Sequence, residues 1–478
     1  AAGTITAGGT SASTTIADTS LTPPPVGQVY SLTTAPNTFT GNSGDDTFNA
    51  FVANSWSTGD SIDGVSGNDS FNITSATAVT APVGASVANI DTSTITTTGN
   101  VTLNTTGWTG LTTLNSTGAG KSALTASATT DVTSTTTLLV NAAGNEQQIS
   151  GGKDVTSTTT VANTLGTTAA SQIVIGGATT AAPAGAVTVT HTETATDDTG
   201  NTTSTGSALT ITGGTSITST YNMAEVGTSD NANDAITAGV TTITGNASTT
   251  TVSATQTAAA ARSANGAAIV NGAVTVNDVN RASATKAGTI TDVTVSSGAA
   301  VAVNSGALET LNASGTMTTL NAGTLGALTT AAINDLDLNL SALRTTGAVT
   351  IDSDVKTLNV KVSKVLNALG TETASNVADL DVSTSGGKTV NISGDGKLTI
   401  GALGNANTTA SFISTNTGGV TITPSLGTGV TFTGGDGADT ITIGATTKTI
   451  TTGAGNDAVT TGAAFGTGGS LDGGDGDD

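Results

Sequence analysis

The chain has 478 residues, of which 34 are acidic and 12 are basic, and its formal net charge of −22 argues against nucleic acid as a partner because phosphate groups would be repelled. It contains no cysteine, which excludes disulfides, thiolate metal sites and cysteine nucleophiles. Aromatic residues make up 2 % of the chain and hydrophobic residues 36 %, which favours a thin, regular β architecture over a thick aromatic core or a disordered chain.

The first 36 residues are mostly small and polar and include the run Pro23-Pro24-Pro25, so residues 1–36 are expected to form an extended linker or an irregular cap. The sequence has no initiating Met and no signal peptide. It also has no apolar run of about 20 residues, so no membrane-spanning helix is expected. Because the last residues stop inside a glycine- and aspartate-rich repeat, we expect a fragment cut from a larger protein.

Residues 37–75 contain two Gly/Asp loops, GNSGDD at 41–46 and GVSGND at 64–69. Both resemble the calcium-binding nonapeptide G-G-x-G-x-D-x-U, but Asn42 and Val65 replace its second glycine, which leaves a pair of Asx-rich turns as the alternative. We predict an N-terminal RTX-like calcium-binding segment here. Its candidate ligands are Gly41, Asp45, Asp46, Asp60, Asp63, Gly64 and Asp69.

Residues 76–430 alternate short β-type runs with Gly, Asn or Ser turns and show no helical pattern, which predicts a Thr/Ala/Gly-rich β-solenoid. Apolar-polar-apolar triplets begin at Leu336, Leu358 and Leu380, each 22 residues after the one before, a spacing that suits one solenoid coil. The Asn that follows an inward-facing Leu, as in Leu311-Asn312, is expected to stack on its equivalents in neighbouring coils.

Other acidic turns in this segment could each line a calcium site between coils, although a solvated turn aspartate is the more common outcome. They are Asp197-Asp198-Thr199-Gly200-Asn201, Asn277-Asp278, Asn334-Asp335 with Asp337, Asp352-Ser353-Asp354 and Gly394-Asp395-Gly396.

The side chains needed for catalysis are scarce. His191 is the single histidine, and it lies in an alternating run without an HExxH or G-x-S-x-G motif, so we expect a surface imidazole there. Lys and Arg do not cluster. The carboxylate pairs lie in Gly-rich turns, where cation binding explains them better than acid–base catalysis. We therefore predict that the protein is not an enzyme.

The clearest motif is at the C-terminus, where GGDGADTI at 434–441 fits the nonapeptide pattern. TGAGNDAV at 452–459 repeats it with Thr452 in place of the first glycine, and a third copy begins at Gly473. The spacing from Asp439 to Asp457 is twice the nonapeptide length, which is one full turn of a parallel β-roll. We predict a truncated RTX β-roll over residues 431–478, with the candidate ligands Gly434, Asp436, Asp439, Gly453, Gly455, Asp457, Asp475 and Asp478.

These residue types suit calcium for physical reasons. Glycine permits positive φ and so lets carbonyl oxygens face a common centre. Ca²⁺ takes about six to eight oxygen ligands at about 2.3–2.6 Å, which carbonyls and aspartates of two adjacent coils could supply. Without the ion, facing carboxylates would repel one another, so metal binding is expected to be coupled to folding. The predicted fold class is all-β: an elongated parallel β-solenoid or RTX β-roll with calcium-bound Gly/Asp loops.

The repeats of residues 434–478, with GATTK at 444–448 between two of them, resemble those of the RTX-type calcium-binding surface-layer (S-layer) proteins of caulobacter-type bacteria. The segments at 270–276, 282–288, 308–312 and 391–395 are similar to the solenoid of the same family, so the resemblance runs from about residue 38 to the end. It implies type I secretion, many bound Ca²⁺ ions and a self-assembled two-dimensional hexagonal lattice of hexamers. It also implies a location on the surface of a Gram-negative bacterium, with lipopolysaccharide bound by an N-terminal domain that this sequence lacks.

Two hypotheses of function therefore compete. A structural surface-layer protein should self-associate when Ca²⁺ is added, whereas an RTX adhesin or biofilm-matrix protein should stay monomeric and bind a glycan or a surface. Ice binding is a third possibility by analogy of fold, but runs such as Thr156-Ser157-Thr158-Thr159 lack the fixed period that a flat threonine face requires.

Overall fold

The computed structural model of the chain describes residues 4–5, 14–15, 25–138, 144–164, 171–177, 181–196, 203–226, 235–259, 268–283, 286–323, 335–382, 388–404 and 410–478. Every regular element in these ranges is a β-strand and none is a helix, which confirms the predicted all-β class. It follows that the described ranges contain no apolar helix of membrane-spanning length.

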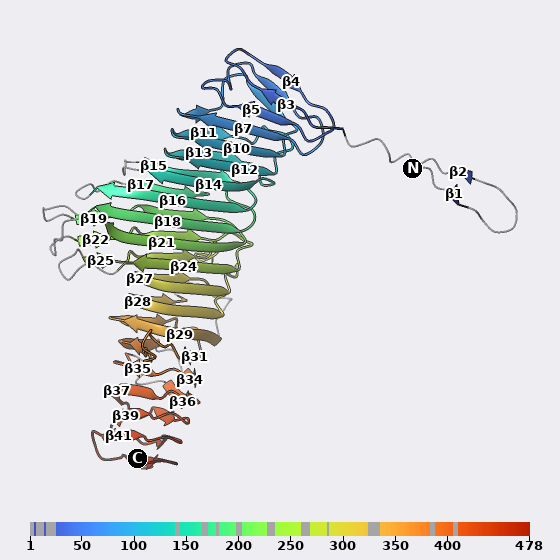
Figure 1. Cartoon of the computed structure of the whole chain (residues 1–478). Helices are drawn as coiled ribbons and strands as arrows, with labels where there is room; N and C mark the ends of the chain where they lie inside the picture. The colour runs from blue at the N-terminus through green and yellow to red at the C-terminus, as the bar shows by residue number, and fades with distance from the viewer. Residues whose placement is uncertain are drawn as a thin grey trace. The chain divides into compact units, whose positions relative to one another are not determined.

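Two compact units divide the chain, residues 1–118 and 119–478. Each is a parallel β-solenoid whose strands pair with equivalent strands of the next coil (Figure 1), as predicted. In unit 1 the main ladder contains β3 (Val29–Ser31), β5 (Thr47–Ala50), β7 (Ser70–Ser75), β10 (Thr92–Thr97) and β12 (Thr113–Gly118). Its other strands are β4 (Thr38–Thr40), β6 (Ser61–Asp63) and β9 (Ser86–Ala88) in a second ladder, β8 (Val79–Thr80) with β11 (Val101–Asn104), and the antiparallel pair β1 (Thr4–Ile5) and β2 (Thr14–Thr15).

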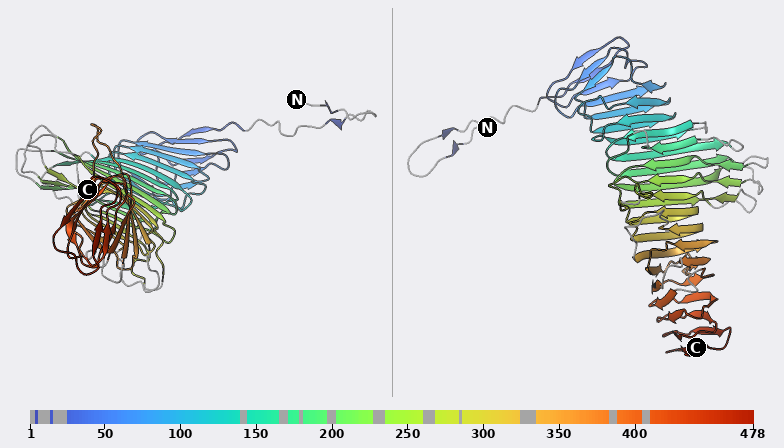
Figure 2. Two further views of the ribbon diagram at one scale, coloured as in Figure 1. Left: turned by 90° about the horizontal axis from the view of Figure 1, so that it is seen from below. Right: turned by 180° about the vertical axis from the view of Figure 1, so that it is seen from behind.

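Unit 2 is elongated, and its strands stack as successive rungs (Figure 2). One long ladder contains β14 (Asp131–Leu138), β16 (Val155–Thr164), β18 (Val187–Thr196), β21 (Ser216–Val226), β24 (Thr251–Ala258), β27 (Asp292–Asn304), β28 (Thr310–Ala322), β29 (Asp335–Thr345), β31 (Thr357–Ser363), β34 (Lys388–Gly394), β36 (Ala410–Ser414), β38 (Thr431–Thr433), β40 (Thr449–Thr451) and β42 (Ser470–Asp472).

The opposite side of the coils of unit 2 is formed by shorter ladders. The first contains β13 (Ser122–Ala126), β15 (Gly144–Gly151), β17 (Ser171–Ile175), β20 (Ala208–Thr212), β23 (Thr241–Thr244) and β26 (Val274–Asn277), and it continues through β27 and β28 to β30 (Ala348–Ile351) and β33 (Asp379–Val382). The second leads from β29 to β32 (Ser375–Val377), β35 (Leu398–Ile400), β37 (Val420–Leu426), β39 (Thr440–Ile443) and β41 (Ala458–Thr461). A separate sheet contains β19 (Thr203–Thr205), β22 (Ala235–Thr237) and β25 (Ala268–Val270).

The core is a narrow column of alternate side chains. In β21, for example, every second residue from Ile217 to Glu225 is buried, including Tyr221 and Met223, while the residues that alternate with them are more exposed. Equivalent positions lie on one another, so Ile217 pairs with Val252 and Val252 with Val293. Because each such side chain is covered by its neighbours above and below, each contributes about 1.5–3 kcal/mol of burial without a thick core.

Asparagine ladders run along the solenoid, as predicted for the Asn that follows an inward Leu. Asn339 donates to Oδ1 of Asn312 at 2.8 Å, and Asn391 donates to Oδ1 of Asn359 at the same distance. In unit 1, Asn72 donates to Asn49 at 3.1 Å. These side-chain hydrogen bonds stabilise the in-register stacking of coils.

The predicted regular repeat is only partly right. Leu336 does pair with Leu358, but Leu380 pairs with Val349, on another side of the coil. Leu358 pairs instead with Val390, because the segment between β31 and β34 holds an extra turn and two more strands.

Coil length is therefore irregular. Asn359 and Asn391, which are bonded neighbours on successive coils, are 32 residues apart in the sequence. The separation rises to 41 residues between Thr250 and Thr291, which are also hydrogen-bonded across one coil. The sequence suggested segment boundaries after residues 75 and 430. At both places the strand before the boundary pairs with the strand after it, so the ladder continues.

Replacing Phe432 with Ala should destabilise the C-terminal coils by about 3–5 kcal/mol. Its ring is fully buried in register between Phe412 and Ile450, so the truncation leaves a cavity that these neighbours cannot fill. Hydrogen exchange across residues 410–461 measures the loss. Thr433→Ala is the matched control, because Thr433 is exposed on the same strand. Equal protection in the two variants would contradict the packing described here.

Candidate metal centre

The Gly/Asp loops of unit 2 stack at one corner of successive coils. They follow β38, β40 and β42, and in-register pairing of these strands places loops 434–439, 452–457 and 473–478 above one another. The final Asp of each loop accepts a backbone hydrogen bond from the coil before it. Val420 donates to Oδ1 of Asp439 at 2.8 Å, Asp439 to Asp457 at 2.8 Å, and Asp457 to Asp478 at 3.0 Å.

The second oxygen of two of these carboxylates lacks a well-formed hydrogen bond. Asp439 is fully buried and Asp457 nearly so, and Oδ2 of each has no partner of good geometry, although the backbone of Gly435 lies near enough to the Asp439 carboxylate to stabilise its charge in part. Burial, reinforced by the charge of Asp457, raises the pKa of Asp439 to about 6. An unpaired buried carboxylate oxygen is costly, and an ordered water or a bound cation would remove that cost.

Carbonyl oxygens of the next coil approach the same place. A Cβ atom at Gly434 would lie 1.8 Å from the carbonyl oxygen of Thr452 and 2.6 Å from Oδ2 of Asp439, so only glycine fits. Among the described residues no group of three or more acidic or histidine side chains could hold a metal. A calcium ion would thus be held by Asp439 and Asp457 together with main-chain carbonyls such as that of Thr452, a donor set of oxygens that suits this hard cation.

Unit 1 repeats the arrangement with three aspartates. Asp46 donates its N–H to Oδ1 of Asp69 at 2.7 Å, and Asp69 donates to Oδ2 of Asp91 at 2.8 Å. Oδ2 of Asp69 is buried without a partner, and burial, followed by the charges of its acidic neighbours, raises the pKa of this carboxyl. A Cβ atom at Gly64 would lie 2.2 Å from the carbonyl oxygen of Asn89 and 2.3 Å from Oδ2 of Asp69.

Sequence reasoning missed Asp91 and Asn89, since residues 86–91 contain no glycine and do not match the nonapeptide. The available signal was spacing: Asp91 follows Asp69 by 22 residues, close to the 23 that separate Asp46 and Asp69.

Several predicted ligands lie elsewhere or already have partners. Both oxygens of Asp60 accept backbone hydrogen bonds, from Asn37 at 2.6 Å and Ser57 at 2.5 Å. Asp46 likewise accepts from the N–H groups of Gln28 and Asn42. Asp63 accepts from Asn89 Nδ2, and Asp45 from the N–H of Asn68.

The remaining predicted ligands lie in the C-terminal loops or beside Asp46. Asp436, Asp475 and Asp478 are exposed, the carbonyl oxygen of Gly453 accepts from the N–H of Asp475 at 2.9 Å, and Gly455 adopts a φ of 129°. A Cβ at Gly41 would meet Oδ2 of Asp46 at 2.1 Å. The structure therefore links the predicted ligands in two stacks. Asp46 bonds Asp69 in unit 1, and Asp439, Asp457 and Asp478 are bonded in series in unit 2.

In some acidic turns of the solenoid, a side chain of the protein itself binds the oxygen atoms of the turn. The ammonium group of Lys388 is buried and donates to the carbonyl oxygens of Asp352 at 3.2 Å, Ser353 at 2.9 Å and Val355. The ammonium group is thus surrounded by carbonyl oxygens, in the position that a bound metal ion could otherwise take. Burial lowers the pKa of Lys388, while Asp352 and Asp354 oppose the shift.

Two further turns use other donors. Nδ2 of Asn416 donates to the carbonyl oxygen of Gly396 at 3.0 Å, directly beneath the first Gly/Asp loop of unit 2. The buried carboxylate of Asp278 accepts three backbone hydrogen bonds, from Asn280, Thr289 and Ile290, and a fourth from the hydroxyl of Ser305. At both turns the protein itself supplies hydrogen bonds to the oxygens named here. Among the other acidic turns, the carboxylate of Asp337 accepts a hydrogen bond from Nδ2 of Asn359, and that of Asp395 accepts one from the backbone N–H of Lys364. Residues 197–201 and Asn334 lie outside the described residues.

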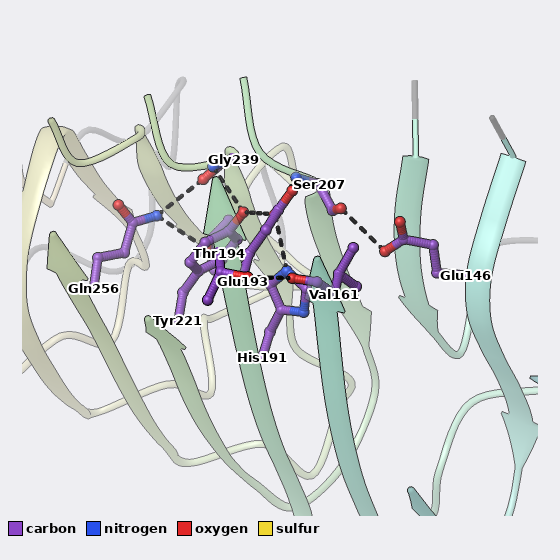
Figure 3. Close-up of polar contacts among 10 residues, drawn as sticks. Glu146, Val161, His191, Glu193, Thr194, Ser207, Tyr221, Gly239 and Gln256 are labelled. Carbon is purple, nitrogen blue, oxygen red and sulfur yellow. Dashed lines mark hydrogen bonds and ion pairs between the residues drawn. The ribbon is translucent and has the colours of Figure 1, made fainter. Parts of the chain in front are cut away.

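The expectation of a surface imidazole at His191 is wrong. Its side chain is fully buried, with Nε2 3.2 Å from Oε2 of Glu193 (Figure 3). The same carboxylate oxygen accepts from Tyr221 OH and the N–H of Ser207, both at 2.7 Å. The sequence alternates in this run, and the prediction assigned His191 to the outward face. In the structure His191, Glu193 and Ala195 all lie on the inward face of β18.

This buried cluster is structural. Burial alone would raise the pKa of Glu193, but hydrogen bonding and charge from His191, with the other donors, outweigh it and lower the pKa. Burial and the Glu193 charge raise the pKa of Tyr221 well above its usual value. Ser207 links the cluster to Glu146 at 3.0 Å, and the 3.0 Å bond from the N–H of Gly239 to Tyr221 OH extends it. Since these side chains are fully buried, a substrate cannot reach them.

No protein-family model matches this chain, and no curated protein is significantly similar to it. The resemblance to surface-layer proteins therefore remains a prediction.

In calcium-free protein, the C-terminal coils should lose stability as the pH rises from about 4 to 6. The folded state binds the proton of Asp439 more tightly than the unfolded chain, whose carboxyl pKa is about 3.9, so the stabilisation present below pH 4 disappears above pH 6. We expect roughly 2 kcal/mol, allowing for solvent screening. Hydrogen exchange of residues 431–461 against pH measures it. Asp439→Asn should abolish the dependence and the exposed control Asp436→Asn should keep it; the reverse would contradict the assignment.

Lys388→Met should destabilise the coils around residues 348–400 by about 3 kcal/mol, because it removes three hydrogen bonds from a buried ammonium group to carbonyl oxygens of one turn. The loss should be the same with and without calcium in hydrogen-exchange measurements. Lys361→Met on the neighbouring strand is the control, since Lys361 is exposed. Wild-type protection in Lys388→Met would show that the ammonium does not hold this turn.

Proposed function

We propose that this chain is a non-enzymatic structural protein that binds calcium at its Gly/Asp loops and self-assembles into a two-dimensional lattice on a bacterial cell surface. The observation that carries the calcium part is that the Gly/Asp loops hold three buried carboxylate oxygens without a hydrogen bond of good geometry, on Asp69, Asp439 and Asp457. Each lies in a stack of aspartates from successive coils, where like charges repel unless a cation lies between them.

The charge of the chain would make self-assembly depend on cations. Copies with a formal net charge of −22 repel one another, and divalent cations bound at the loops reduce that repulsion. Calcium would therefore act twice, by ordering the loops of each copy and by allowing copies to approach. Secretion by the type I route, a Gram-negative source and a tether to lipopolysaccharide rest on the resemblance of the repeats alone.

The test is a calcium titration followed by circular dichroism and light scattering, with magnesium and EGTA as controls. We expect calcium, but not magnesium, to increase the β signal and then to produce large ordered particles visible by electron microscopy. Both effects should reverse with EGTA.

Variants show which aspartates bind the calcium that causes these changes. Asp439→Asn with Asp457→Asn should weaken calcium binding about tenfold or more, whereas Asp436→Asn in the same loop should leave it near wild type because that side chain is exposed. A gain of β signal without particle growth would favour the adhesin hypothesis. No response to calcium would overturn the proposal.

A further inference from the structure

Threonine side chains form a regular array on the outer face of unit 2. The array covers five rungs of the long ladder, β14, β16, β18, β21 and β24, which run nearly parallel to one another in Figures 1 and 2. These strands pair in register and without a shift, so outward-facing positions line up in three columns across them. The columns are Thr133, Thr156, Thr188, Thr218 and Ser253; Thr135, Thr158, Thr190, Thr220 and Thr255; and Thr137, Thr160, Thr192, Asn222 and Thr257.

The composition of this threonine array is nearly uniform. All but two of its side chains are threonines, the exceptions being a serine and an asparagine, and none is charged. The residues that alternate with them along each strand are buried. The expectation that threonine runs lack a fixed period is therefore wrong for this face, because strand alternation leaves Thr156 and Thr158 outside and turns Ser157 and Thr159 into the core.

The β propensity of threonine does not by itself account for the array. The same ladder continues beyond β27, and there its outward positions include Asp337, Asn339 and Lys361. A preference for strand-forming residues would act on those rungs as well. The uniform, uncharged face is thus a local feature of the five rungs from β14 to β24.

The hydroxyl groups of the array are available to a ligand. None of them makes a hydrogen bond with another residue of the part of the chain that the structure describes. A hydroxyl can both donate and accept, and the β-branched threonine side chain has few rotamers. Strand geometry spaces neighbouring groups by about 4.8 Å across the strands and by about 6.6 Å along them.

Hydrogen bonds in the core hold the strands of the array together from behind. Gln147, from the opposite side of the coil, donates to Oγ of Ser134 on β14 at 2.6 Å and accepts from Thr159 on β16 at 2.7 Å. The 2.7 Å bond from Tyr221 to Glu193 joins β21 to β18 in the same way. Because these bonds fix the position of one strand relative to the next, the grid of hydroxyl and methyl groups is preformed.

We propose that the threonine array binds ice. The surface of an ice crystal is uncharged, repeats in two directions and presents hydrogen-bond donors and acceptors at fixed intervals, and the array has the same three properties. Each hydroxyl contributes little, but groups on one rigid face bind together as a unit. The repetition in two directions suits an extended crystalline surface better than a small soluble ligand, which would engage only a few of the groups.

Ice binding by this face is independent of calcium binding and of lattice formation. The array lies between residues 133 and 257, whereas the Gly/Asp loops lie at 41–69 and 434–478. Light scattering on the same sample reports self-assembly separately, so a failure of the proposed lattice would leave the present inference standing, and the reverse also holds.

The test measures thermal hysteresis of the full chain in calcium-containing buffer, together with its partition into a slowly growing shell of ice. We expect faceted ice crystals, a gap between the melting and freezing temperatures, and enrichment of the protein in the ice relative to serum albumin. The absence of both hysteresis and enrichment in the wild-type protein would overturn the proposal.

Two matched substitutions locate the activity. Thr190→Tyr places a bulky ring at the centre of the array, which should keep ice away from the neighbouring threonines and remove most of the hysteresis. Thr210→Tyr makes the same change on β20, on the opposite side of the coils, and should retain the wild-type value. Both positions face outwards and tyrosine has a high β propensity, so both variants should fold, as circular dichroism and thermal unfolding would show.

Thr158→Tyr, in the same column as Thr190, provides a second reading if the first variant does not fold. Full activity in a folded Thr190→Tyr or Thr158→Tyr variant, or an equal loss in Thr210→Tyr, would show that the threonine array is not the surface that binds ice.

Discussion

The structure depends on parallel pairing in register, because it places each residue directly on its equivalent in the next coil. Apolar residues then cover apolar residues, as Phe412 covers Phe432, and asparagines bond asparagines, as Asn339 bonds Asn312. Both stacks are favourable. The same rule places Asp439 on Asp457, and like charges so arranged repel. The stacking that builds the core thus creates the demand for positive charge at the corners.

The coils of unit 2 meet that demand in different ways. Lys388 brings a tethered ammonium group into the carbonyl cage of the turn at 352–355, and Asn416 contributes an amide to the turn at 393–396. From Asp439 onwards the corner carries carboxylates with one oxygen unpaired, and no side chain of the described residues supplies the missing partner. If calcium is that partner, its removal should open the C-terminal coils and leave the coils closed by Lys388 intact.

The sequence was sufficient for whatever depends on local pattern. Alternation and turn residues predicted an all-β solenoid, the Leu-Asn pairs predicted asparagine ladders, and the nonapeptides predicted stacked loops at Asp439 and Asp457. It was insufficient where a contact depends on coil length. Lys388 lies 33 residues from Val355, and the irregular coil length hides that relationship. Asp91 was missed for another reason, because its turn lacks the glycines of the nonapeptide although its spacing from Asp69 is regular.

The buried cluster around Glu193 has a physical role in such an irregular solenoid. Bonded neighbours on successive coils are separated by 18 residues at Asp439 and Asp457 but by 41 residues at Thr250 and Thr291. The sequence repeat therefore cannot fix the register, and a slip of two positions would keep apolar side chains inside. A slip that moved Tyr221 from its partner His191 towards Val189 would separate its hydroxyl from Glu193 and leave a carboxylate short of a donor in the core, at a cost of several kcal/mol. Polar groups in the interior therefore select one register among several that burial alone would allow, much as the asparagine ladders do on the outside.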